Sequence, residues 1–125
     1  MTNPRAPMLL DGRYTATTNS WDQENLTWRG VHLFLRISEV SGTTPTLDIK
    51  IQAKDTPLGT YYDLSGASFT QKTSAVSDDL LVYPGVSETA NRKVSGVLPV
   101  YWRVVATIGG TSPSFTFTLV AHCLP

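Results

Sequence analysis

Apolar and polar side chains alternate in two stretches of the chain that are far apart. Residues 47–53 read LDIKIQA, and residues 115–121 read FTFTLVA, with the same apolar spacing and a less charged opposite face. A period of two places successive side chains on opposite faces of a β-strand. Both stretches are therefore predicted to be strands with one buried face.

The wording around these strands is repeated as well. SGTTP (41–45) precedes the first strand and GGTSP (109–113) the second, and each is itself preceded by an apolar stretch, at 31–40 and 100–108. Glycine permits positive φ and proline fixes φ at the start of the next strand, which favours strand, turn, strand. The pattern predicts one β-hairpin module used twice, at corresponding positions of two packed sheets. An ancient duplication and convergence on the same turn chemistry both explain the repeat.

The remaining segments supply further short strands. These are predicted at residues 12–20, 59–66, 67–73 and 78–85, while the polar stretch 86–99 is expected to hold one helical turn. About eight antiparallel strands at regular spacing favour an all-β fold, a β-sandwich or jelly roll. The expected core comprises Leu33, Leu35, Ile37, Leu47, Ile49, Ile51, Phe69, Leu81, Trp102, Val104, Phe115, Phe117 and Leu119.

Size and charge limit the classes of protein that fit. The 125 residues suit a single domain over 12–125 with an extended arm at 1–11, and ten basic side chains balance ten acidic ones. This neutral balance gives no electrostatic signature for nucleic acid or an anionic membrane. With one cysteine the fold depends on packing rather than on an internal disulfide. The short apolar run at 8–10 does not resemble a secretion signal, so we expect synthesis in the cytosol.

Catalytic and metal-binding patterns are weak. His32 and His122 are interpreted as outward-facing strand residues and Cys123 as a small apolar filler, and the chain lacks a G-x-S-x-G motif. The acidic pairs Asp22/Glu24 and Asp78/Asp79 could hold calcium, but solvated turn residues are the simpler interpretation. Residues 25–27 fit an N-glycosylation pattern that occurs often by chance. We therefore expect a protein that is not an enzyme and that uses no cofactor and no metal.

Two groups of residues are candidates for binding a partner. Exposed aromatic rings stack on sugars or anchor protein interfaces, but they also close the ends of a sandwich. The rings in or beside predicted loops are Trp21, Trp28, Tyr61, Tyr62 and Tyr83. The arm either lies extended against a neighbouring protein, inserting residues 8–10 into a groove, or frays. Its candidate contact residues are Pro4, Arg5, Pro7, Met8, Leu9 and Leu10.

One resemblance adds to this interpretation. SGTTPTLDIKIQAKDTPLGTYYDLSGASFTQ (41–71) and LPVYWRVVATIGGTSPSFTFTLVA (98–121) resemble small structural proteins of tailed bacteriophages, encoded among head genes and thought to decorate the capsid. The likeness covers about residues 30–122. It implies a non-enzymatic β-sandwich that binds the major capsid protein on the outside of the shell, commonly as a trimer, and it offers no catalytic residues.

These observations lead to three hypotheses. The first is a capsid decoration and stabilisation protein, made in the bacterial cytoplasm and located on the exterior of the virion, which contacts the capsid through its arm and loop aromatics. The second is a carbohydrate-binding module for adhesion, with Trp28 or Tyr62 as sugar-stacking rings. The third is a tail-tube or adaptor subunit of the same virion.

Overall fold

The computed structural model describes residues 7–125, and this part of the chain contains strands and turns but no helix. The all-β prediction is therefore confirmed. The strands are β1 (Met8–Tyr14), β2 (Thr18–Asn19), β3 (Gln23–Glu24), β4 (Gly30–Asp55), β5 (Thr60–Ser68), β6 (Ser77–Val82), β7 (Lys93–Val94) and β8 (Tyr101–Leu124).

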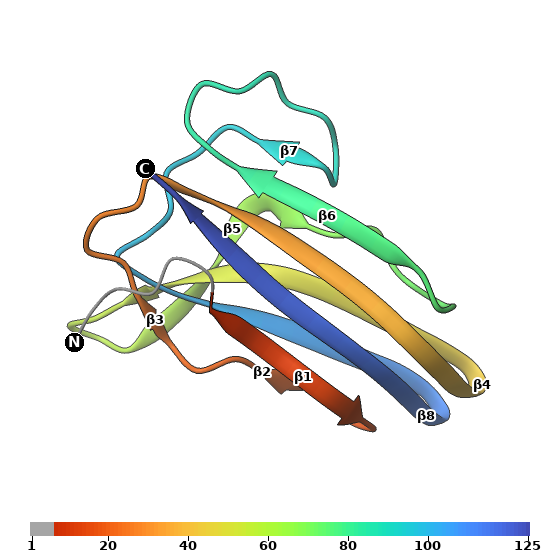
Figure 1. Cartoon of the computed structure of the whole chain (residues 1–125). Helices are drawn as coiled ribbons and strands as arrows, with labels where there is room; N and C mark the ends of the chain where they lie inside the picture. The colour runs from red at the N-terminus through yellow and green to blue at the C-terminus, as the bar shows by residue number, and fades with distance from the viewer. Residues whose placement is uncertain (1–6) are drawn as a thin grey trace.

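Two long strands organise the molecule. β4 and β8 pair antiparallel along their whole length, from Gly30 opposite Leu124 to Ala53 opposite Trp102. Both bend at the same level, so the ribbon folds over itself into two layers (Figure 1). β1, β6 and β7 extend the layer that holds the start of β4 and the end of β8, the first layer, whereas β2, β3 and β5 extend the second layer. The β6–β7 pair is parallel and the other pairs are antiparallel.

The two copies of the repeated sequence, residues 41–45 and 109–113, form the bend of this ribbon. Ser41 lies opposite Ser114 and Thr43 opposite Thr111, so the two copies face each other. Their backbones match: Gly42 and Gly110 have φ of 111° and 112°, and Thr44 and Ser112 have φ of 47° and 49°. A local two-fold relation therefore connects the copies, since each glycine approaches the backbone of the other copy.

The hairpin prediction is thus wrong in its pairing, although both copies do contain a change of direction. Residues 31–37 pair with residues 117–123, and residues 46–53 pair with 102–109, instead of with each other. Strand periodicity determines which face of a strand is buried, but it does not determine the partner of that strand. The glycine and proline residues make a corner between layers, and a one-residue register shift between Ile37 and Glu39 precedes it.

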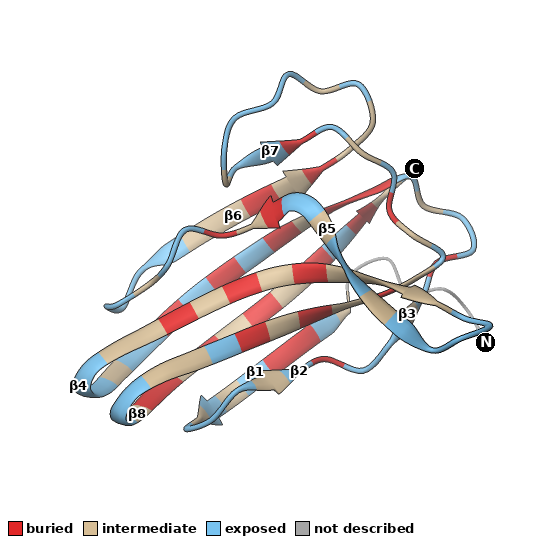
Figure 2. Cartoon of the chain, turned by 180° about the vertical axis from the view of Figure 1, so that it is seen from behind, coloured by how far each residue is buried: buried red, intermediate tan, exposed pale blue. Residues whose placement is uncertain are grey.

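The core lies between the two layers, where alternate residues of β4 and β8 are buried (Figure 2). Of the expected core residues, only Leu81 is wrong. It is half-buried, whereas its neighbours Leu80 and Val82 are fully buried. The segment 78–82 is therefore one position out of phase with the prediction. Trp102 is buried in the core, as expected.

Two further expectations are wrong, one about the N-terminal arm and one about the loop at residues 86–99. The predicted arm overlaps β1: Leu10 pairs with Leu119, and the side chains of Leu9 and Leu10 are buried in the core. Their insertion into a neighbouring protein is therefore excluded by their own packing. Residues 86–99 contain a turn at Thr89–Arg92 and the short strand β7 in place of the helical turn.

Candidate binding surfaces

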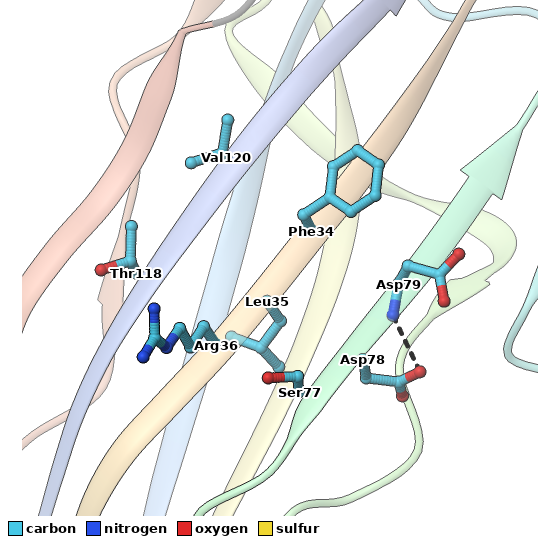
Figure 3. A pocket seen from close by; sticks show the side chains of 8 residues that line it. All are labelled: Phe34, Leu35, Arg36, Ser77, Asp78, Asp79, Thr118 and Val120. Atoms are coloured by element: carbon cyan, nitrogen blue, oxygen red, sulfur yellow. Dashed lines mark hydrogen bonds between the residues drawn. The ribbon is translucent and has the colours of Figure 1, made fainter.

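The outer face of the first layer carries a row of apolar side chains. The register places Met8 of β1, Val120 of β8 and Phe34 of β4 in one line across the strands. Phe34 is 39% exposed, and its ring contacts His32 at 4.2 Å and His122 at 4.9 Å between centroids. A groove of about 540 Å³ runs beside it, named here the Phe34 groove (Figure 3). It is lined by Phe34, Leu35, Arg36, Ser77, Asp78, Asp79, Thr118 and Val120.

Hydrogen bonds and ion pairs hold the acidic wall of the Phe34 groove in place. The Asp79 carboxylate lies 2.7 Å from Nε2 of His32, and this hydrogen bond lowers the pKa of Asp79. Lys72 Nζ lies 2.5 Å from the Asp78 carboxylate, and both side chains are largely buried. Arg92 lies 3.3 Å from the Asp79 carboxylate. The interpretation of Asp78 and Asp79 as solvated turn residues is therefore wrong, because both belong to β6 and each carboxylate has a cationic partner, Lys72 or Arg92.

Exposed apolar side chains also gather in the loops at the end of the sandwich away from the corner. The backbone N–H of Asn25 donates to Val100 O at 2.6 Å, and the backbone N–H of Leu98 donates to Arg29 O at 2.8 Å. The loop that holds Asn25 and the loop that holds Leu98 therefore lie side by side. These loops present three exposed apolar side chains, 58–68% accessible, named here the loop-end cluster. Its members are Leu26, Val97 and Val100.

Asn25 holds these loops together. Its side chain is buried, and its Nδ2 donates to Trp28 O at 2.7 Å and to Leu98 O at 3.1 Å. Its Oδ1 accepts hydrogen bonds from the N–H groups of Thr27 and Trp28. A buried amide with these partners is a structural residue, which agrees with the low weight given to the glycosylation pattern.

The outer face of the second layer is polar and aromatic. The Arg103 guanidinium lies 3.5 Å over the centre of the Tyr61 ring, and the Tyr61 hydroxyl donates to Asp22 at 2.8 Å. Lys54 Nζ reaches the same carboxylate at 2.8 Å. Desolvation acts to raise the pKa of Asp22, but the hydrogen bonds from Lys54 and Tyr61 outweigh it and lower that pKa. These four side chains are named here the Asp22 network.

The predicted aromatic residues have different environments. Trp28 is partly buried against the core and therefore helps to close the sandwich. Tyr83 is half-buried and donates its hydroxyl hydrogen to Pro125 O at 2.7 Å. Tyr61 belongs to the Asp22 network, whereas Trp21 and Tyr62 expose most of their surface.

The predicted arm residues also have different environments. Pro4 and Arg5 lie outside the described residues. Pro7 is half-buried, and its carbonyl accepts from Ala121 N–H at 3.0 Å, while Met8 is exposed. The Phe34 groove and the loop-end cluster were not predicted. Phe34 could have been found, because it occupies an outward position in the alternation of 31–37, but the adjacency of the two loops depends on the tertiary fold.

The single cysteine is enclosed by the fold. Cys123 is buried on the inner face of β8, and this burial raises the pKa of its thiol. A thiolate is the reactive form of cysteine, so a raised pKa makes the side chain less nucleophilic. The prediction that Cys123 fills space in the core is confirmed.

Over residues 7–125, no three histidine, cysteine or acidic side chains are grouped so that they could hold a metal ion. In the same part of the chain, no helix has the length and apolar character needed to cross a membrane. Comparison of the chain with protein-family models, curated proteins and solved structures gives no match.

Proposed function

We propose that this protein is a non-enzymatic structural component of a tailed bacteriophage virion, which decorates and stabilises the capsid by binding the major capsid protein. The resemblance of residues 30–122 to phage head proteins supports this class. The observation that carries the proposal is the loop-end cluster, because exposed apolar side chains in neighbouring loops are typical of a protein interface. In this proposal the loop end faces the shell.

The size of the loop-end cluster indicates how such binding would work. Complete burial of a valine or leucine side chain contributes about 1.5–3 kcal/mol, and these side chains are already partly buried. Loss of translational and rotational freedom costs about 4–15 kcal/mol on association. Three apolar contacts in one copy therefore give weak binding. A trimer that engages a repeating lattice through three copies binds much more tightly, because the second and third contacts are intramolecular.

The Phe34 groove is the surface that we assign to contact between copies in this trimer. It lies on the first layer, where Met8, Val120 and Phe34 form an apolar row across three strands. Phe34→Lys should give a monomer in light scattering at a protein concentration at which the parent chain is a trimer. Thr107→Lys, which adds the same charge to the exposed face of the second layer, should leave the trimer intact.

Capsid binding is tested by co-sedimentation with empty shells assembled from the major capsid protein of the same genome. Val97→Asp combined with Leu26→Asp should abolish binding, because the charges oppose burial of the loop-end cluster. Val76→Asp is the matched control, since Val76 is an exposed valine just before β6 and outside the cluster. Equal binding by the cluster variant and the parent protein would overturn the assignment of this surface.

The arm contributes a separate test. Because Leu9 and Leu10 belong to the core, removal of residues 1–11 would damage the fold, whereas removal of residues 1–6 leaves β1 complete. We expect the shorter deletion to weaken shell binding while thermal unfolding stays unchanged. Labelling of the protein within purified particles distinguishes a capsid location from the alternative of a tail-tube or adaptor subunit.

A further inference from the structure

The outer face of the second layer has the composition of a ligand-binding surface that capsid docking does not require. Alternate residues of β4 point outward here, so Gln52 lies opposite Arg103 of β8 and Lys54 follows on the same face of β4. Tyr101 lies on the same face of β8 as Arg103. β5 adds Tyr61 opposite Lys54 and Asp63 opposite Gln52. Aromatic rings and hydrogen-bonding groups therefore alternate over three neighbouring strands.

The polar groups of this face bond to one another. Asp63 accepts from Lys50 Nζ and from Gln52 Nε2, both at 3.0 Å, and the hydrogen bond from Gln52 is the largest cause of the lowered pKa of Asp63. Arg103 Nε donates to Gln52 Oε1 at 3.0 Å. The charges of the face balance, because the cations Lys50, Lys54 and Arg103 are matched by the carboxylates of Asp22, Asp63 and Glu24, and Glu24 accepts from the Tyr101 hydroxyl at 2.7 Å. The face therefore favours a neutral ligand rather than an ion.

Trp21, which directly precedes Asp22 in the sequence, carries an exposed ring. Its side chain is 89% accessible, the highest value among the large exposed apolar side chains of the described residues. Its backbone is nevertheless held, because its carbonyl accepts from Gln23 Nε2 at 2.9 Å and from Ser20 Oγ at 3.1 Å. The amide of Ser20 in turn donates to Val104 O at 3.0 Å. A ring on a fixed backbone loses little conformational freedom on binding.

We propose that Trp21 and the Asp22 network form a binding site for a neutral glycan. The exposed indole provides a flat apolar surface for one face of a sugar ring. The Asp22 carboxylate, the Lys54 ammonium and the Gln52 amide provide acceptors and donors for sugar hydroxyls, which replace water without bringing a charge.

A protein partner fits this face less well. The buried centres of protein interfaces are depleted in Lys, Asp and Glu, whereas this face carries Asp22, Lys50, Lys54 and Asp63. Covering these ion pairs with protein would desolvate them, and the cost of desolvation can exceed the Coulombic gain. A hydroxyl-rich ligand keeps them hydrogen-bonded. The proposal is independent of capsid binding, because it uses a different surface and the isolated protein.

The test is an array of neutral pyranose oligosaccharides, with affinity for the positive compounds measured by isothermal titration calorimetry. Trp21→Ala and Tyr61→Ala should each weaken binding at least tenfold. Tyr62→Ala is the matched control, because Tyr62 pairs with Ala53 and lies on the opposite side of β5, and it should bind like the parent protein. Unchanged thermal unfolding of Trp21→Ala is expected, since the ring is exposed.

Three results would overturn the proposal. The first is the absence of binding to any oligosaccharide on the array. The second is binding that Trp21→Ala leaves unchanged or that Tyr62→Ala weakens equally. The third is loss of shell binding, instead of glycan binding, in the Trp21 variant, which would assign this face to a protein partner. The loop-end variant Leu26→Asp should keep full glycan affinity, so failure of the capsid proposal is separable from failure of this one.

Discussion

The corner between the layers is a part of the fold where a single methyl group should have a large effect. Gly42 has φ of 111°, and a Cβ there would lie 2.6 Å from Ser112 O and 2.9 Å from Pro113 Cα. Gly110 is related to it by the local two-fold, and its Cβ would lie 2.7 Å from Thr44 O. In both Gly42→Ala and Gly110→Ala, the backbone of the facing corner must therefore move.

The magnitude follows from two contributions. A residue in a sparsely populated backbone conformation costs about 1–3 kcal/mol. The clash with backbone atoms adds to this, so the loss of unfolding free energy should be at least about 3 kcal/mol, in the range of severely destabilising substitutions. For a chain of this length the melting temperature should fall by about 12 °C, at roughly 4 °C per kcal/mol.

Urea unfolding followed by tryptophan fluorescence measures this effect. Gly59→Ala is the matched control, because Gly59 also has positive φ, at 72°, but its Cβ would meet no atom within 4 Å. It should cost only about 1 kcal/mol. The double variant Gly42→Ala/Gly110→Ala should lose less than the sum of the single losses, since both act on one pair of facing corners. Equal losses at Gly42 and Gly59 would refute the paired corner.

Three further predictions concern side chains. Lys72→Met should cost about 2–4 kcal/mol by leaving Asp78 largely buried without its nearest cation, and Lys72→Met/Asp78→Leu should recover most of this in urea unfolding. The hydrogen bond from His32 lowers the pKa of Asp79, so the stability gained from the carboxylate is present above about pH 4 and is lost as the pH falls further. Asp79→Asn should therefore flatten the decrease in unfolding free energy between pH 5 and pH 3. An unchanged slope would contradict this. Cys123 should react with a maleimide only at the rate of unfolding, and rapid labelling of the folded protein would show that the thiol is accessible.

Much of the fold could be predicted because it depends on local alternation. The buried positions of β4 and β8 follow a period of two, and twelve of the thirteen expected core residues are buried, with Leu81 as the exception. The error at Leu81 has a physical reason, since 80–82 is a continuous apolar run and gives no local sign of which face is inward. The pairing of strands could not be predicted. Gly42 and Gly110 suit a hairpin turn and a corner equally well, and the choice depends on long-range hydrogen bonds.

The candidate surfaces were less predictable than the core. Trp21 and Tyr61 were found by their residue type, but the contacts of Tyr61 with Asp22 and Arg103 require the segment before β3 and the strands β4, β5 and β8 to be brought together. The loop-end cluster contains ordinary leucine and valine residues, which carry no sequence signal of exposure. The predicted arm, residues 1–11, extended into β1, because the apolar residues at 8–10 suit an edge strand and a docking segment equally well.

The most direct test of the proposed function is cryo-microscopy of shells assembled from a major capsid protein encoded in the same genome, after incubation with the purified protein. The capsid proposal predicts density for two-layered sandwiches at repeated positions on the outer surface, with the loop that carries Leu26 against the major capsid protein and the corner at Gly42 pointing away. Shells without such density at saturating protein, or sandwiches that contact the shell through the corner, would contradict it.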